Sequence, residues 1–359
     1  MKKISIENIL EEKAPIIDKA IEKYIPRRYD KDSLVFTLGP PRFEYHLQAL
    51  NKAVAEPVWE FLDRGGKRWR PTLFLLVCEA LGKDPKEFLD FAIIPEVIHN
   101  GLIMIDDIED SSESRRGKPC THKLFGLDIA INAGNEMFYL PLLTLIKNKE
   151  KLPPSKMNKI YEIYVQEMIN VGFGQAMDIA WHRGLANADE ISQKQYMQMC
   201  AYKTGTIARM SAKIATVLAD ASDDVVEKIG RFAESIGVAF QIQDDILDLV
   251  SEAFAKMKGG LGQDITEGKR TLMVIHTLEK AEPNDRKRLL EILNMHTTDQ
   301  RLRDKAINII RDYGSIDYTK NYARRIVSES WKDVDDVLSS SEAKEKLKAF
   351  ADYLIERQI

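Results

Sequence analysis

The sequence predicts an all-α protein, a single-domain helical bundle around a deep central cavity. Apolar residues recur at helical spacing through most of the 359 residues, and strand alternation bounded by turn pairs is nearly absent. A hydrophobic content of 44% and a charged content of 30% are typical of an ordinary globular protein. We expect one domain over residues 1–359, in which residues 1–40 form an N-terminal extension of unclear role.

Composition and charge argue against nucleic-acid-binding, membrane-spanning, secreted and zinc-binding proteins. A net charge of −4 gives no reason to expect a nucleic-acid partner, and no run of 18 apolar residues predicts a membrane span. The first residues lack the apolar core of a secretory signal and carry acids that a transit peptide avoids. Three scattered cysteines and six histidines without a metal-binding spacing argue against zinc and indicate reduced thiols, so we expect a cytoplasmic protein.

Helical periodicity gives the elements of the first 81 residues. A first helix is predicted over 4–24, with Pro15 as a point where it could divide. Residues 27–41 are predicted to be a loop that ends in a Gly-Pro-Pro sequence. A second helix follows over about 43–62, and the strongly apolar segment 72–81 is expected to be a core helix.

The next helices frame the first acidic motif. Asp84 and Pro85 suit the cap and first position of a helix, and Pro95 should kink or restart it. A further helix is predicted over 127–146, with Pro141 as a kink.

The second half is predicted to be helical as well. Helices are expected over 157–180, 191–218 and 225–250. Residues 256–270 form a Gly- and Lys-rich loop, and the remainder up to residue 359 is a set of amphipathic, highly charged helices.

The first acidic motif ends an apolar helical run. Asp106 and Asp110 are four residues apart, so their carboxylates share one face of a helix, while Asp107 points away from it. Oxygen-only ligands favour a hard divalent cation, above all Mg²⁺. Arg115 and Arg116 follow, and arginine is well suited to forked contact with phosphate. The alternative is an acidic helix end followed by a solvated loop.

A second copy of this spacing strengthens the metal interpretation. Asp244, Asp245 and Asp248 repeat the pattern after another apolar run. Two such helices facing each other across a cavity could clamp one diphosphate through metal ions and stabilise it as it leaves.

Other candidates are weighed against ordinary structural roles. Lys67 and Arg70 follow two glycines and could bind one anion, or they could be solvated residues after a helix end. His99 lies about two turns before the first motif, and a lone helical histidine is often a core residue. Gln175 and Asp178 form a polar pair in an apolar run, and they either bond locally or line the cavity.

Two further regions follow the same logic. Lys203 and Thr204 lie beside a glycine in a helical stretch, which could turn them toward the cavity or simply mark a helix boundary. Gln241 lies one turn before the second motif. Lys258 and Lys269 flank the Gly-rich loop, which is either a lid that adds cations to a bound diphosphate or a solvated loop.

Taken together, these segments resemble the trans-isoprenyl diphosphate (polyprenyl) synthases. The matching segments, in family order, are GGKRWRP, IHNGLIMIDDIEDSSESRRGKP, GQAMDIA, YKTGT, FQIQDDILDL, GQDITEGKRTL and FADYLIERQI. The amino-acid sequence around the first acidic motif is particularly similar to that of geranylgeranyl diphosphate synthases. The resemblance implies an all-α homodimer that condenses isopentenyl diphosphate head to tail with a C5, C10 or C15 allylic diphosphate. It also implies Mg²⁺ as cofactor, about three ions per active site with diphosphate bound, and a membrane-seeking product.

The resemblance implies roles for individual residues. The Mg²⁺ ligands would be Asp106, Asp110 and Asp244, supported directly or through water by Asp107, Asp245 and Asp248. The allylic diphosphate would be held by Arg115, Lys203, Lys258 and Lys269. Isopentenyl diphosphate would be bound by Lys67, Arg70, His99 and Arg116. The allylic cation would be stabilised by Thr204 and Gln241. Lys258 stands one position earlier than the family's lid lysine.

Product length is the remaining expectation from the family. The wall residues would be Ile98, Gly101 and Leu102. Short-chain members often have an aromatic ring at one of the last two positions, so Gly101 is expected to leave the tunnel open to C20 or longer products. On this hypothesis Gly101→Phe should shorten the product.

Two alternatives remain. A non-catalytic regulatory subunit need not keep both acidic motifs and the Arg115–Arg116 pair. A class I terpene cyclase shares the fold and the ionisation step, but it binds no second diphosphate and so gives no reason for Lys67, Arg70 and Arg116.

Overall fold

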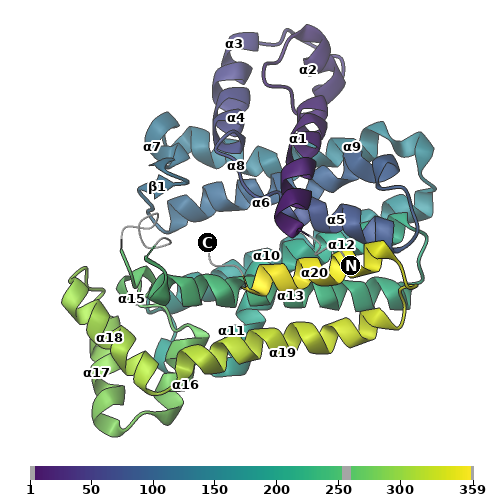
Figure 1. The fold of residues 1–359 in the computed structure, drawn as a ribbon. Coiled ribbons are helices and arrows are strands. Elements are labelled where there is room, and N and C mark those ends of the chain that lie inside the picture. Colours follow the sequence, from purple (N-terminus) through teal and green to yellow (C-terminus); the bar gives the residue numbers. More distant parts are fainter. Residues whose placement is uncertain (1–4, 253–259, 357–359) are drawn as a thin grey trace. The chain divides into compact units, whose positions relative to one another are not determined.

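A computed structural model of the chain describes residues 5–252 and 260–356 (Figure 1). The described residues are helical apart from turns and a short hairpin, which confirms the all-α prediction. The chain forms two compact units that are interleaved in sequence. Unit 1 comprises Met1–Glu162, Ser211–Ser222 and Ser341–Leu347, and unit 2 comprises Ile163–Met210, Asp223–Ser340 and Lys348–Ile359. The single domain around one cavity stays a prediction.

Unit 1 begins with the long helix α1, which four short helices follow. They are α1 (Ile6–Tyr24), α2 (Lys31–Leu38), α3 (Leu47–Leu50), the π-helix η1 (Asn51–Ala55) and α4 (Glu56–Leu62). Helix α1 stays unbroken at Pro15. The prediction of a loop over 27–41 was wrong, because α2 lies within these residues. Asp30 caps α2 in a capping box with Ser33, and Leu34 is buried in a small apolar cluster.

The centre of unit 1 follows the prediction more closely. Its elements are α5 (Trp69–Ala80), η2 (Pro85–Phe88), α6 (Leu89–Glu109), β1 (Ser114–Arg115), β2 (Lys118–Pro119), α7 (Thr121–Phe125), α8 (Leu127–Tyr139), η3 (Leu140–Leu142), α9 (Leu143–Lys147) and η4 (Lys149–Lys151). Asp84 caps η2 by accepting a hydrogen bond from the Lys86 amide at 3.0 Å. Helix α6 continues through Pro95, whereas the predicted break at Pro141 is confirmed as η3. Helices α6 and α8 pack side by side (Figure 1).

Unit 2 is built around the long helix α13. Its elements are the larger part of α10 (Pro154–His182), η5 (Ala188–Glu190), α11 (Gln193–Cys200), the π-helix η6 (Ala201–Gly205), the beginning of α12 (Thr206–Leu218), whose remainder belongs to unit 1, α13 (Asp223–Val250), α15 (Gln263–Thr266), α16 (Leu272–Lys280), α17 (Pro283–Asn294), α18 (Gln300–Asp312), α19 (Ser315–Asp335) and part of α20 (Glu342–Glu356). Helices α13 and α19 pack along each other (Figure 1), and the rings of Phe232 and Trp331 meet edge to face at 5.2 Å. The helix predicted over 191–218 is therefore three elements, because η6 interrupts it.

Two segments pass a test of length and composition for crossing a membrane. They are Pro85–Glu109 and Leu127–Lys147. Their most apolar windows are 61% and 50% buried inside the structure, as in core helices of a globular protein.

Candidate active site

The C-terminal end of α6 presents the first acidic motif. Asp106 and Asp110 lie one turn apart and are half-buried, and the Asp110 amide donates to the Asp106 carbonyl at 2.9 Å. Their donor set, two carboxylates on one helix face, fits a hard cation such as Mg²⁺ that keeps water or substrate oxygens as its other ligands. Within the described ranges, no three His, Cys, Asp or Glu side chains converge into a complete protein cage.

Asp107 turns inward and meets Arg115. Its Oδ1 atom accepts from Arg115 Nε at 2.7 Å and lies 2.5 Å from Nη2. Burial lowers the pKa of Arg115, but the Asp107 carboxylate outweighs it and the net pKa is raised. Asp107 is therefore a partner that fixes Arg115 near the acidic end of α6.

A hairpin presents the arginine pair. Strands β1 and β2 are antiparallel, and Arg116 and Gly117 form the two-residue turn with φ of 52° and 76°. Arg64 holds both strands, since its guanidinium donates to the carbonyls of Arg115 at 3.2 Å and Pro119 at 2.8 Å. Sequence reasoning missed Arg64, whose only local signal was its position one turn after Glu60.

A cluster of guanidinium groups surrounds His99. Burial lowers the pKa of His99 well below its usual value, and the charges of Arg70, Arg116, Arg115 and Arg68 act in the same direction. Burial also lowers the pKa of Arg116 to about 10, helped by the charges of Arg68 and Arg115. The histidine is thus a neutral imidazole in a pocket of surplus positive charge, which suits an anion with several oxygens.

The basic residues around the start of α5 differ in exposure. Lys67 is exposed, whereas Arg70 is buried and its guanidinium stacks 4.3 Å from the centroid of the Trp69 ring. Arg68, which sequence analysis did not single out, is buried in the left-handed conformation at φ 47°.

The expected open space beside Gly101 is absent. A Cβ atom at Gly101 would lie 2.8 Å from the Gly134 carbonyl oxygen and 2.8 Å from Met137 Cβ, because α6 and α8 approach closely there. Ile98 is fully buried and Leu102 is half-buried. The role of these positions as a chain-length wall stays a prediction, but a large side chain at Gly101 would collide with α8.

In unit 2, glycines position the π-helix η6. A Cβ atom at Gly174 of α10 would lie 2.3 Å from the Lys203 amide nitrogen, and one at Gly237 of α13 would lie 2.8 Å from Gly205 Cα. Close packing on both helices fixes the segment that carries Lys203 and Thr204. The π-helix gives the local irregularity that the sequence suggested there. The two glycines were missed, since their partners are distant in sequence.

Lys203 is paired within this segment. Its Nζ atom lies 2.5 Å from Asp178 Oδ2. This contact gives Asp178 a side-chain partner on η6, so the bond is not one within its own helix α10.

A chain of hydrogen bonds connects η6 to the second acidic motif. The Thr204 hydroxyl donates to Gln241 Oε1 at 3.0 Å, and Gln241 Nε2 donates to Asp245 Oδ1 at 2.8 Å. The hydroxyl of Tyr196 on α11 donates to Asp245 Oδ2. Burial raises the pKa of Asp245 to about 7, and the charge of Asp264 acts in the same direction. Thr204 and Gln241 are thus brought together as predicted, and Tyr196 is an addition.

The second motif also organises the loop that follows it. Asp248 Oδ2 accepts from the Asp264 amide at 3.0 Å, while Asp244, one turn before, is half-buried. Lys269 Nζ lies 2.5 Å from Glu267 and 3.7 Å from Asp264. Burial lowers the pKa of Lys269, but these two carboxylates raise it overall.

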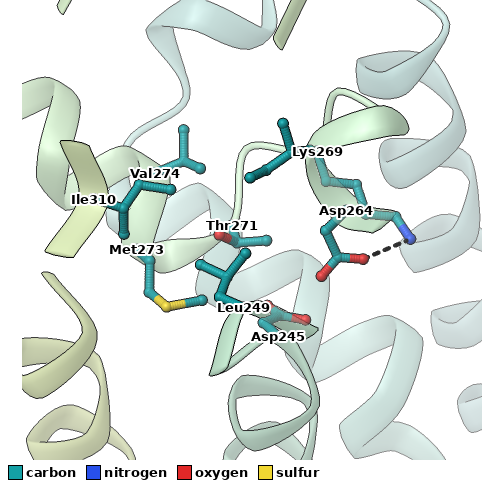
Figure 2. A pocket seen from close by; sticks show the side chains of 9 residues that line it. Asp245, Leu249, Asp264, Lys269, Thr271, Met273, Val274 and Ile310 are labelled. Carbon is teal, nitrogen blue, oxygen red and sulfur yellow. Dashed lines mark ion pairs between the residues drawn. The ribbon is translucent and has the colours of Figure 1, made fainter. Parts of the chain in front are cut away.

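Figure 2 shows the pocket at this place. Asp245, Asp264 and Lys269 form its polar side, and apolar residues that include Leu249 and Met273 form the rest. Lys258 lies outside the described residues. The carboxylate oxygens of this motif are the donor type that Mg²⁺ prefers, as in unit 1.

Each unit therefore gathers part of the predicted set. Unit 1 brings the first acidic motif together with the arginine pair, His99 and Arg70. Unit 2 brings the second acidic motif together with Thr204, Gln241 and Lys269. The opposition of the two motifs across a cavity stays a prediction.

Comparison with known proteins shows the family to which the chain belongs. A model of the polyprenyl synthetase family matches residues 51–310. A short chain isoprenyl diphosphate synthase of Methanothermobacter thermautotrophicus is 35% identical over 297 residues, which cover 83% of this chain and 88% of the relative. A geranylgeranyl diphosphate synthase of Methanosarcina mazei is 31% identical, covering 83% and 87%. The crystal structure of geranylgeranyl pyrophosphate synthetase from Pyrococcus horikoshii matches with a TM-score of 0.83 and 29% identity, covering 98% of each chain. The chain belongs to the polyprenyl synthetase family of prenyl-transferring enzymes.

Proposed function

We propose that this chain condenses isopentenyl diphosphate head to tail with an allylic diphosphate and yields an all-trans prenyl diphosphate of about C20. Family membership and relatives named geranylgeranyl diphosphate synthase support the reaction class and this length. The observation that carries the proposal is that Arg115 interacts both with the acidic end of α6, through Asp107 and Asp106, and with His99, two turns earlier on the same helix. A group of positive charges next to a pair of carboxylates suits a diphosphate and its metal ions.

Isopentenyl diphosphate is the proposed ligand of the cationic pocket in unit 1. Lys67, Arg70 and Arg116 supply charge, and the neutral imidazole of His99 can donate one N–H bond without adding to the repulsion among the arginines. Burial is the main cause of the depressed pKa of Arg116, and the charges of Arg68 and Arg115 act in the same direction, as expected where a bound anion would relieve both effects.

The allylic diphosphate is the proposed ligand of the acidic motifs. Mg²⁺, bound by Asp106, Asp110 and Asp244 with about three ions per site, would supply the charge that neutralises the departing diphosphate. Arg115, Lys203, Lys258 and Lys269 are the proposed protein cations for the same group. Asp107 keeps Arg115 in place, while Asp178 does so for Lys203.

Thr204 and Gln241 are proposed to stabilise the allylic cation. Their side-chain oxygens are oriented by the bonds that connect Thr204, Gln241 and Asp245. Fixed dipoles of this kind need no reorganisation when charge develops, and apolar walls exclude water from the cation.

A homodimer in the cytoplasm is the proposed assembly and location. Helix α8 of unit 1 exposes Leu127, Ile131 and Tyr139 at 55%, 39% and 63%, which supports a subunit contact there. The three cysteines are free and buried, in keeping with a reducing compartment.

Incubation with labelled isopentenyl diphosphate, Mg²⁺ and in turn C5, C10 and C15 allylic diphosphates tests the activity. We expect elongation that stops at about C20, read by separating the products by length. If the folded protein elongates none of the three primers, the regulatory-subunit or cyclase interpretation replaces this one. A cyclase would consume a C15 or C20 allylic diphosphate without isopentenyl diphosphate.

A further inference from the structure

A continuous chain of buried and half-buried polar contacts in unit 1 connects helix α1 to Arg116, and we call it the polar relay. Arg68 donates through Nε to Asp18 of α1 at 2.8 Å and through Nη1 to Glu96 of α6 at 2.9 Å. Asn100 Nδ2 donates to Glu96 Oε1 at 3.0 Å. Asn100 Oδ1 then accepts from Arg116 Nη1 at 3.2 Å.

The middle of the relay lies in the interior of the unit, whereas the side chain of Asp18 at one end is 42% exposed and Arg116 at the other is half-buried. Asn100 is fully buried, while Glu96 and Arg68 are 3% and 4% exposed. Such groups are costly to bury, and a well-packed apolar set of similar volume is often at least as stable. Stability alone therefore gives little reason for this arrangement, whereas its geometry has a clear consequence.

That consequence is the placement of Arg116. The residue has a positive φ of 52°, a conformation unfavourable for a side chain, and like charges crowd its guanidinium. Asn100 Oδ1 and the Gly65 carbonyl accept from the same Nη1 atom, which fixes the direction of the guanidinium. The negative charge of Glu96 opposes the repulsion from the neighbouring arginines.

We propose that Glu96 and Asn100 are positioning residues for isopentenyl diphosphate, acting through Arg116. The inference rests on the proposed function, since it takes Arg116 as a ligand of that substrate. Asn100 aims the guanidinium, and Glu96 holds Asn100 in the correct amide orientation while partly balancing the cationic pocket. Through Arg68, helix α1 supports the same pocket, which gives the N-terminal segment a functional task.

The experiment compares Asn100→Ala with Asn148→Ala. Asn148 is a matched control because it is buried at 5% and its Nδ2 also donates to the carbonyl four residues earlier, at 2.8 Å. Its other bond goes to the Tyr24 hydroxyl and leaves the arginines untouched. For Asn100→Ala we expect KM for isopentenyl diphosphate to rise about tenfold, the loss of one hydrogen bond to a charged group. KM for the allylic diphosphate should stay within about twofold, and Asn148→Ala should change neither constant.

Calorimetric titration with isopentenyl diphosphate gives a second readout that needs no turnover. We expect weaker binding to Asn100→Ala and, to a smaller degree, to Glu96→Gln, which keeps the side-chain volume and serves if the alanine variant fails to fold. Equal weakening of both substrates, or unchanged binding in a folded variant, would overturn the positioning role. A wild-type chain that neither binds isopentenyl diphosphate nor elongates a primer would instead overturn the proposed function and this inference with it.

Discussion

His99 shows how a single residue takes its character from its surroundings. In isolation a histidine is half-protonated near pH 6.5, but here burial and four neighbouring guanidinium groups keep it neutral. A neutral N–H donor beside arginines could contact an oxygen of the proposed diphosphate without adding to the repulsion among the positive charges.

The depressed pKa of His99 predicts a specific dependence of stability on pH. Below about pH 6.5 the unfolded chain takes up a proton that folded His99 does not, so the free energy of unfolding falls by up to about 1.4 kcal/mol per pH unit. Urea unfolding at pH 7.5 and 5.5 should therefore show a smaller loss for His99→Gln than for the wild type. Equal losses would mean that His99 protonates freely in the folded state.

The acidic motifs predict a second residue-level result. Asp106→Asn and Asp244→Asn should each lower the elongation rate by about 10²-fold or more, because each removes a carboxylate that is proposed to bind Mg²⁺. Glu109→Gln is the control, since Glu109 is exposed at the same helix end. The rates are measured under saturating Mg²⁺, with circular dichroism to confirm folding. Near-normal rates in both Asn variants would contradict the metal assignment.

At the scale of residues, the sequence singled out most of the residues proposed to bind substrate and few of the residues that position them. The acidic motifs and the arginine pair are visible as local spacing. Arg64, Arg68 and Asn100 act through partners 16 to 55 positions away, and no local pattern encodes such contacts. Asp107 was grouped with the metal residues, but its inward turn toward Arg115 depends on the hairpin that follows.

At the scale of elements, the helices that carry the site depend on glycines for their close approach. Gly174 faces the backbone of η6, whereas Gly172 of the same helix has nothing within 4 Å of its would-be Cβ atom. Because Gly172 and Gly174 lie in the same helix but only Gly174 packs against η6, the same substitution at both positions makes a controlled comparison.

Gly174→Ala should therefore destabilise the protein by about 1–3 kcal/mol through overpacking. The same substitution at Gly172 should stabilise it by about 0.5–1 kcal/mol, because alanine favours the helix. Only Gly174→Ala should also lower kcat, since η6 carries Lys203 and Thr204. Denaturant unfolding and steady-state kinetics on both variants check this, and similar behaviour of the two would exclude a special role for Gly174.

The α6–α8 contact changes the chain-length experiment. Gly101→Phe should unfold or strongly destabilise the protein, because its Cβ atom alone would lie 2.8 Å from backbone and side-chain atoms of α8. Leu102→Phe, at the adjacent half-buried wall position, is expected to keep the fold and shorten the main product. Product analysis and thermal unfolding of both variants provide the measurement. A stable Gly101→Phe enzyme would show that α8 can withdraw.

The sequence predicted the existence of most helices but not their irregular parts. The 3.6-residue period is clear over the long helices α6 and α13, whereas the five residues of η6 are too few to reveal a change of period. Helix α2 was missed because a single buried leucine gives no periodic face, although its capping box was present in the sequence.

For the whole molecule, the proposed homodimer is the property that most needs a measurement. We expect light scattering to give twice the monomer mass. A double variant, Leu127→Glu with Ile131→Glu, should shift the mass toward the monomer, because two charges on one exposed apolar face of α8 oppose association. Met295→Glu, at another exposed apolar residue after α17, is the control and should stay dimeric. A monomeric wild type would refute the dimer directly.

The π-helix η6 has a consequence for how this chain tolerates insertions and deletions. A π-helix corresponds to one residue inserted into an α-helix, so deleting Ala201 would let α11 and α12 join as one regular helix. Residues on either side of the deletion would keep nearly the same relative orientation, because the wider π-turn already absorbs the extra residue. Thr204, which lies within η6, would instead move relative to Gln241. At this position a deletion would therefore make the backbone more regular while it disturbs the contact between Thr204 and Gln241, the pair proposed to stabilise the allylic cation.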